Sequence, residues 1–154
     1  MATKLHSNYE IRWKNFRRFE DTGWVELKPL TILLGSNNAG KSSIISPLLL
    51  LSQTLESKDS EVPLLPFGPL IDLGTYKDFV HTHDVNRELF FGMRFHSHST
   101  SSKIKKVGTY PPGGIELTFS AGSTPERMSL KRFEVTDIFK LILFTCGKQD
   151  RFFS

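Results

Sequence analysis

Two glycines, a lysine and a serine stand at fixed spacing between residues 35 and 42, and their types suit the chemistry of phosphate binding. The segment reads Gly35-Ser36-Asn37-Asn38-Ala39-Gly40-Lys41-Ser42, which is the spacing of a P-loop, or Walker A motif. A polyphosphate needs converging backbone N–H donors, room for close approach and a cation. Gly35 and Gly40 leave that room because they carry no side chain, and Lys41 supplies the charge.

Each part of this loop has an expected role toward a bound nucleoside triphosphate. We expect the N–H groups of Asn38–Ser42 to form an anion-binding nest, and the helix that starts near Gly40 to add the positive end of its dipole. Lys41 should reach the β- and γ-phosphates as the predicted catalytic cation. The Ser42 hydroxyl is the predicted Mg²⁺ ligand, and Ser43 can donate to the α-phosphate. The predicted cofactors are ATP and Mg²⁺, and the loop's predicted binding residues are Gly35, Ser36, Asn37, Asn38, Ala39, Gly40, Lys41, Ser42 and Ser43.

Hydrolysis also needs a carboxylate on the Mg²⁺ side of the site, usually at the end of an apolar strand. After the loop, Leu141–Phe144 is apolar but is followed by Thr145 and Cys146, and the run before Asp72 is short and broken by Pro69. The sequence therefore predicts a nucleotide-binding half-site without a recognisable Walker B carboxylate. It leaves open whether this chain alone is an enzyme.

A P-loop must lie between a strand and a helix, and the neighbouring residues predict both. Leu30–Leu34 is a short apolar run, which indicates a strand buried on both faces. Apolar residues recur at near-helical spacing over residues 41–56, where Pro47 predicts a bend or a late start. We also expect a surface loop at 57–70 and a mobile loop at 96–106.

Further elements complete the predicted fold. Strands are expected at residues 9–14, 24–27, 88–95, 115–119 and 129–135, and a turn entering a short helix at 71–80. We therefore predict an α/β, P-loop NTPase fold in a single domain over residues 1–154, with a mixed β-sheet and a P-loop helix.

Composition sets limits on the class of protein. With 154 residues, of which 38% are apolar and 23% charged, the chain fits one globular domain. Its net charge of +4 permits contact with a polyanion without arguing for one, and we interpret its two basic clusters as solvated faces. One cysteine, no membrane-length apolar segment and no apolar leader at the N-terminus predict a cytoplasmic protein.

Histidines and the cysteine are weaker candidates for chemistry. His81-x-His83 and His96-x-His98 have the spacing of alternate metal ligands, but no cluster of Cys or carboxylates accompanies them. We therefore favour solvated or locally hydrogen-bonded histidines. Cys146 has no local His or Asp partner, which argues against a catalytic thiol.

Aromatic residues near the basic N-terminal cluster have two interpretations. Trp13, Phe16 and Phe19 could stack on an adenine or an unpaired base. Core packing is the favoured alternative.

Two stretches together resemble a known group of ATPases. Residues 13–19, Trp13-Lys14-Asn15-Phe16-Arg17-Arg18-Phe19, and the run and loop over residues 30–43 resemble the start of ABC-type ATPases of the chromosome-maintenance (SMC), RecF and OLD-nuclease kind. Those have an NFR-x-F turn and a G-x-N-x-x-GKSS loop. Residues 48–56 and 72–81 are similar to bacterial predicted AAA-type ATPases of this group, several of which accompany nucleases in anti-phage systems.

The resemblance covers residues 5–95 well and 110–135 loosely, and it implies the N-terminal lobe of an ABC-type head. It implies that Asn37 lies near the phosphates and that Arg17 or Phe19 lies near the nucleotide, so Arg17 joins the predicted site. Two heads of this kind sandwich ATP, which implies a homodimer or a larger ATPase assembly. A nuclease and DNA are the candidate partners, and no membrane is expected.

The sequence departs from the family pattern in its second half. It has no LSGG-like signature, no late carboxylate pair and no switch histidine, so we expect a longer polypeptide or another chain to supply them. Gln53 comes too early to be assigned as the Mg²⁺-contacting glutamine of such heads.

Three functions stay open at this point. The first is an ATPase that dimerises on ATP in DNA maintenance or anti-phage defence. The second is a truncated or regulatory module that binds nucleotide without turnover and signals through an exposed apolar edge. The third is a nucleic-acid-binding module, for which a steep salt dependence of DNA binding would be the sign.

Overall fold

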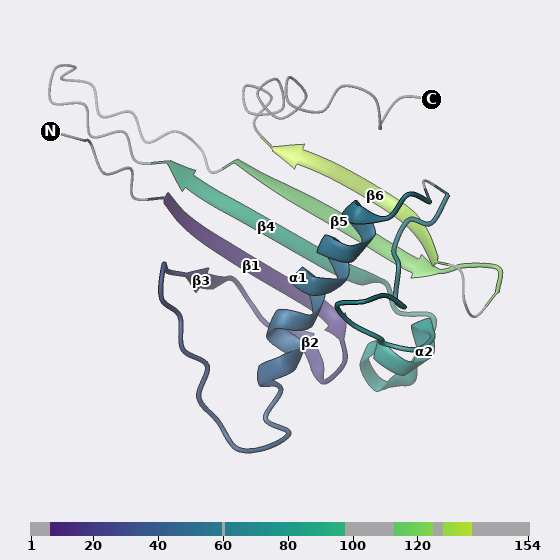
Figure 1. Ribbon diagram of the computed structural model, residues 1–154, viewed down its shortest axis with the longest axis horizontal. Helices are drawn as coiled ribbons and strands as arrows, with labels where there is room; N and C mark the ends of the chain where they lie inside the picture. The colour runs from purple at the N-terminus through teal and green to yellow at the C-terminus, as the bar shows by residue number, and fades with distance from the viewer. Residues whose placement is uncertain (1–6, 60, 98–112, 125–127, 137–154) are drawn as a thin grey trace, which may run out of the picture.

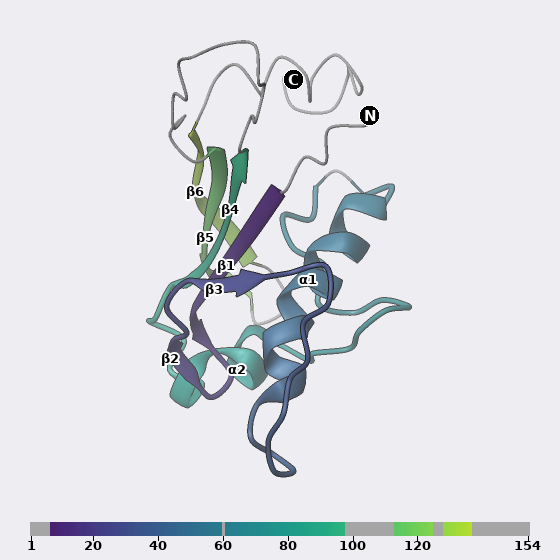
Figure 2. The same ribbon diagram turned by 90° about the vertical axis from the view of Figure 1, so that its left-hand side faces the viewer.

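The computed structural model describes residues 7–59, 61–97, 113–124 and 128–136, and these residues form a β-sheet with one long helix packed on it (Figures 1 and 2). In chain order the elements are β1 (Ser7–Phe16), β2 (Phe19–Asp21), β3 (Val25–Leu27), α1 (Lys41–Glu56), α2 (Tyr76–Phe79), η1 (His81–His83), β4 (Leu89–Ser97), β5 (Gly113–Ala121) and β6 (Met128–Thr136). The strand order is β2-β1-β4-β5-β6, and β3 also pairs with β1.

Every strand pair in the described part of the chain is antiparallel. The combination of this sheet with helix α1 confirms the α/β class. A mixed sheet would also contain parallel strand pairs, and the described residues form none. The strands predicted at 9–14, 24–27, 88–95, 115–119 and 129–135 match β1, β3, β4, β5 and β6 to within two residues. Of the loop predicted at 96–106, His96 and Ser97 belong to β4 and the remainder lies outside the described residues.

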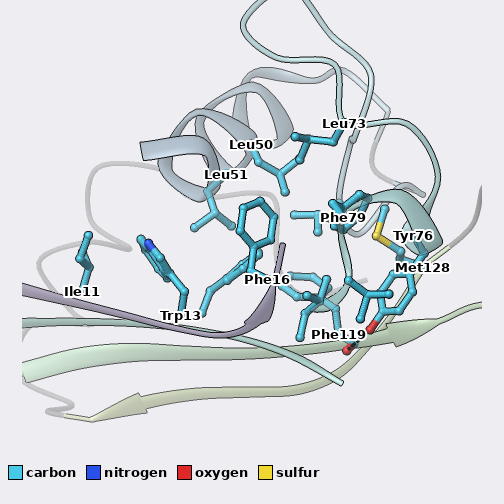
Figure 3. Packing of buried hydrophobic residues seen from close by; sticks show 14 residues of the cluster. Ile11, Trp13, Phe16, Leu50, Leu51, Leu73, Tyr76, Phe79, Phe119 and Met128 are labelled. Carbon is cyan, nitrogen blue, oxygen red and sulfur yellow. Dashed lines mark hydrogen bonds between the residues drawn. The ribbon is translucent and has the colours of Figure 1, made fainter. Parts of the chain in front are cut away.

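The hydrophobic core lies between the sheet and α1, and a cluster of aromatic rings stands at its centre among aliphatic side chains (Figure 3). The Trp13 and Phe91 rings meet edge to face with centroids 5.5 Å apart, and Phe16 packs between Phe91 and Phe79 at 5.8 and 6.0 Å. Such tilted and T-shaped pairs are the favoured aromatic geometries. Trp13 and Phe16 are fully buried, which confirms their interpretation as core residues.

Helix α1 begins at Lys41, so the late start allowed for by Pro47 is wrong. Pro47 has no N–H to offer the carbonyl one turn back, yet the helix continues through it to Glu56 with the proline buried. The Trp13 indole N–H donates to the Ile44 carbonyl at 2.9 Å. This bond fixes the first half of α1 directly over β1.

Gln53 organises the segment that follows α1. Its amide nitrogen donates to the carbonyls of Leu65 and Ile71 at 2.5 and 3.1 Å, and its amide oxygen accepts from the Ile71 N–H at 3.1 Å. The side chain is buried and both of its polar atoms are used. Gln53 therefore has a structural role, because it fixes the segment after α1.

The predicted strand at Leu30–Leu34 is wrong. These residues form no strand, and the side chains of Leu30, Ile32 and Leu34 are 79%, 69% and 89% exposed. In Figure 2 the segment between β3 and α1 runs as a long loop away from the sheet. An apolar run becomes a strand only beside a neighbour that pairs with its backbone, and none of the six described strands pairs with this segment.

No helix among the described residues is long and apolar enough to cross a membrane.

Candidate functional site

The loop predicted to bind phosphate curls around the side chain of Lys41, the first residue of α1. The Lys41 ammonium donates to the carbonyls of Gly35 and Ser36, both at 2.7 Å. A turn bond from the Ala39 N–H to the Ser36 carbonyl, at 3.1 Å, closes the loop. Residues 35–39 are exposed, so the loop presents a cation and its own backbone to solvent.

The N-terminus of α1 opens into this loop. The first helical hydrogen bond runs from the Ile44 N–H to the Gly40 carbonyl at 3.3 Å, so the N–H groups of Lys41, Ser42 and Ser43 precede the helical ladder. No side chain caps this end of the helix among the described residues. Uncapped N–H groups and the positive end of the helix dipole favour an anion.

Gly40 allows another element to approach this helix end. A Cβ atom at Gly40 would lie 2.9 Å from the Phe19 ring and 3.0 Å from the Arg18 side chain, and its φ of +95° is left-handed. Only glycine fits both the space and the backbone. The turn between β1 and β2 therefore lies directly over the start of α1.

This turn is held in a sparsely populated backbone conformation. Asn15 and Arg17 have φ values of 56° and 51°, which are uncommon for residues with a side chain. The Arg17 N–H donates to the Phe79 carbonyl at 2.6 Å, and Phe16 forms a β-bridge with Val80. The segment that begins at α2 therefore fixes the turn.

Beside the turn lies an open pocket of about 460 Å³. Its lining residues come from the turn and from the α2–η1 segment: Arg17, Arg18, Asp78, Val80, Thr82 and His83. Hydrogen bonds from the hydroxyl and the N–H of Thr75 hold the pKa of the Asp78 carboxyl below its usual value. The Asp78 carboxylate thus serves as the acceptor of the Thr75 capping box.

The structure brings most of the predicted residues to one place. The loop residues and Lys41 surround the N-terminus of α1, with Ser42 exposed and Ser43 buried in the first turn. Arg17 lies in the turn that covers this helix end. Arg18 is not among the residues predicted from the sequence, yet its side chain lies beside Gly40 together with the Phe19 ring. The only sequence feature that could have identified Arg18 as a site residue is its position next to Arg17.

Of the first His-x-His pair, His83 makes a local hydrogen bond, as the favoured interpretation predicts, whereas His81 bonds a residue 64 positions away. Nδ1 of His81 lies 2.8 Å from the Arg17 carbonyl, and Nδ1 of His83 lies 2.7 Å from the Lys77 carbonyl. His98 and Cys146 lie outside the described residues. In the part of the chain that the structure describes, no group of three or more His, Cys, Asp or Glu side chains could hold a metal ion.

The donors that are present fit a nucleotide. Three features suit a triphosphate, namely the N–H groups at the start of α1, the Lys41 ammonium and the glycines of the loop. The exposed Ser42 hydroxyl suits a Mg²⁺ ion that takes its other oxygens from phosphate and water.

The family model of the AAA ATPase domain matches residues 9–137, from the third residue of β1 to the end of β6. The match includes the loop, α1 and the β1–β2 turn. Neither a curated protein nor a solved structure matches the chain.

Proposed function

Because the chain belongs to the AAA ATPase domain family, we propose that it binds ATP with Mg²⁺ through the loop and first helical turn at Gly35–Ser43. The placement of Lys41 carries this proposal: its ammonium lies inside the loop, held by the Gly35 and Ser36 carbonyls. The cation, the exposed loop and the open N-terminus of α1 converge, which is the donor set that a triphosphate requires.

Each part of the site has a separate task toward the triphosphate. Lys41 exchanges its two carbonyl partners for phosphate oxygens, which bind an ammonium more strongly because they are charged. The N–H groups of Ser42 and Ser43, together with the helix dipole, stabilise the remaining negative charge. Mg²⁺ supplies charge neutralisation between phosphate oxygens when bound, and Ser42 is the residue that would hold it.

The exposed apolar run supports the proposal that the described residues form half of an ATPase head. Leu30, Ile32 and Leu34 are arranged for a sheet neighbour that the six described strands do not provide. A second lobe, in a longer polypeptide or another chain, supplies that neighbour together with the catalytic carboxylate. The chain then corresponds to the N-terminal lobe of an ABC-type head, and ATP held between two heads joins them into a homodimer or a larger assembly.

The resemblance of residues 13–19 and 30–43 to chromosome-maintenance, RecF and OLD-type ATPases supports the wider setting. DNA maintenance or anti-phage defence is the proposed role, with a nuclease or DNA as the partner. A cytoplasmic location is part of the same proposal.

The experiment compares the wild-type chain with Lys41→Ala and with Lys58→Ala, which removes an exposed lysine beyond the end of α1. Mass by sedimentation equilibrium and phosphate release are followed with and without ATP and Mg²⁺. We expect ATP to raise the mass of wild type and Lys58→Ala but not of Lys41→Ala, with no phosphate release above background. Lys41-dependent phosphate release from this chain alone would contradict the half-site. Binding without any change in mass would instead favour a regulatory nucleotide-binding module.

A further inference from the structure

The β1–β2 turn combines a strained backbone with a set of contacts from one distant segment. Left-handed conformations at residues such as Asn15 and Arg17 persist only where the surroundings fix them. Here the surroundings are residues 79–88, which begin at the last residue of α2 and lie more than sixty positions further along the chain. Thr82 and His83 in this segment have left-handed φ values as well. Strain is therefore present on both sides of the contact.

Both backbone polar groups of Arg17 are bound by this segment. Its N–H donates to the Phe79 carbonyl at 2.6 Å, and its carbonyl lies 2.8 Å from Nδ1 of His81. A carbonyl oxygen can only accept, so Nδ1 of His81 carries the proton in this bond. His81 is thus the only side chain among the described residues that hydrogen-bonds the Arg17 backbone.

The other end of the turn is fixed by the same segment. The Asn15 amide nitrogen donates to the Glu88 carbonyl at 2.8 Å, and its amide oxygen accepts from the Arg87 guanidinium at 3.2 Å. The same guanidinium nitrogen also donates to the Glu20 carboxylate at 3.2 Å. Residues 79–88 therefore hold the turn at both ends.

The turn places the Arg18 side chain beside the N-terminus of α1, and Arg17 is its neighbour in the chain. The Arg18 side chain lies beside Gly40, and Arg17 and Arg18 line the same pocket. Neither arginine forms an ion pair within the described ranges. The Asp78 carboxylate lines that pocket as well, and the positive charge of Arg18 next to the positive end of the helix favours a bound anion.

We propose that His81 is a positioning residue for the nucleotide: it holds the strained Arg17 turn so that the guanidinium groups of Arg17 and Arg18 face the triphosphate at the start of α1. This inference rests on the proposed ATP binding. His81 acts through the two arginines and does not itself contact the nucleotide.

The test is the affinity for ATP–Mg²⁺ of the 154-residue chain in variants that remove or restore the Nδ1 donor. His81→Leu removes the donor, and we expect about tenfold weaker binding, the size of one lost charge-positioning interaction. His81→Asn keeps an N–H close to the same position, so we expect it to restore affinity to within about twofold of wild type. Asn86→Leu is the matched control, because the Asn86 amide lies in the same segment and donates to the Asp84 carboxylate at 3.1 Å, not to the turn.

A double-mutant cycle separates positioning from a general structural role. In the Arg17→Ala/Arg18→Ala background, His81→Leu should weaken ATP binding no further, since the groups that it positions are gone. Equal weakening in both backgrounds would overturn the proposal. So would ATP binding by Arg17→Ala/Arg18→Ala as tight as that of wild type, an outcome that needs no His81 variant to fold.

Failure of this inference differs from failure of the proposed function. If wild type binds ATP in a Lys41-dependent manner while His81→Leu binds equally well, only the positioning role of His81 is overturned. If wild type binds no ATP at all, both proposals are overturned together.

Discussion

Gly40 lies where the loop, helix α1 and the β1–β2 turn come together. Because Gly40 has no side chain, these three segments can approach one another closely. Its φ of +95° is left-handed, and the Phe19 ring and Arg18 side chain occupy the space where a Cβ atom would lie. Gly23 is a natural comparison within the same chain. It has a similarly left-handed φ of +63°, but no atom lies within 4 Å of its ideal Cβ position.

Gly40→Ala should therefore destabilise the protein more than Gly23→Ala. Both variants carry a backbone penalty of about 1 kcal/mol, and only Gly40→Ala adds a collision with the β1–β2 turn. Urea unfolding at neutral pH measures the difference, and ATP binding should fall in Gly40→Ala alone. Equal unfolding midpoints for the two variants would show that the turn does not press on the helix end.

Tyr76 gives a pH-dependent signature in the core. Burial, which disfavours the phenolate, raises the pKa of its hydroxyl to about 12, and the hydroxyl lies 2.7 Å from the Arg87 carbonyl and 3.2 Å from the Phe119 carbonyl. Since the folded state favours the neutral form, this contribution to stability is complete below the unfolded pKa near 10. It is lost as pH rises toward 12.

Tyr76→Phe should lower the free energy of unfolding at pH 8 by about 1 kcal/mol, because two buried carbonyls lose a donor. It should also flatten the fall in stability between pH 10 and 12. Chemical unfolding at several pH values measures both effects, with Tyr9→Phe as the control at an exposed tyrosine. Parallel decline of wild type and Tyr76→Phe above pH 10 would contradict the assignment.

At the scale of elements, the orientation of α1 depends on one hydrogen bond from the sheet. The Trp13 indole donates to the Ile44 carbonyl, one residue after the buried Ser43. Trp13→Phe keeps an aromatic ring in the core but removes the indole donor. We expect a loss of about 2 kcal/mol in the free energy of unfolding, from the lost hydrogen bond and the space left behind.

The control for this prediction is Trp24→Phe. Trp24 lies half-buried, with the Arg94 guanidinium 3.7 Å from its ring centroid, and it makes no contact on which α1 depends. Urea unfolding should show a smaller loss, and amide hydrogen exchange in α1 should accelerate only in Trp13→Phe. Equal acceleration in both variants would mean that the indole bond does not fix the helix.

The elements that the sequence predicted are those whose signals are local. The Lys41 ammonium binds carbonyls only five and six residues earlier in the chain. The residues of the motif alone therefore determine this part of the site. The strands show their faces in the alternation of neighbouring residues. By contrast, the bond from His81 to Arg17 spans 64 residues and that from Asn15 to Glu88 spans 73. No local sequence pattern predicts contacts between residues so far apart in the chain, so the role of residues 79–88 could be found only from the structure.

The prediction of a strand at Leu30–Leu34 failed for a different reason. Its apolar residues are typical of a buried strand, but an apolar pattern does not show whether a neighbouring strand is present to pair with the segment. None of the described strand pairs includes it. The proposed second lobe would supply the neighbouring strand with which this segment pairs.

At the scale of the whole molecule, the exposed run should control self-association. Ile32→Lys places a charge in the run and should reduce concentration-dependent association of the chain, measured by light scattering, without lowering its unfolding midpoint. Leu55→Lys is the control, because Leu55 is similarly exposed on α1. A lower unfolding midpoint for Ile32→Lys would mean that the run is packed inside this chain in solution.

The central claim is that the loop around Lys41 binds a nucleoside triphosphate, and equilibrium binding of ATP with Mg²⁺ tests it most directly. The titration compares wild type, Lys41→Ala and Lys58→Ala at one ionic strength, after far-UV circular dichroism has shown that all three are folded. We predict that wild type and Lys58→Ala bind ATP alike, and that Lys41→Ala binds at least about tenfold more weakly because its cation is gone. Equal binding by wild type and Lys41→Ala, or no binding by wild type, would contradict the claim.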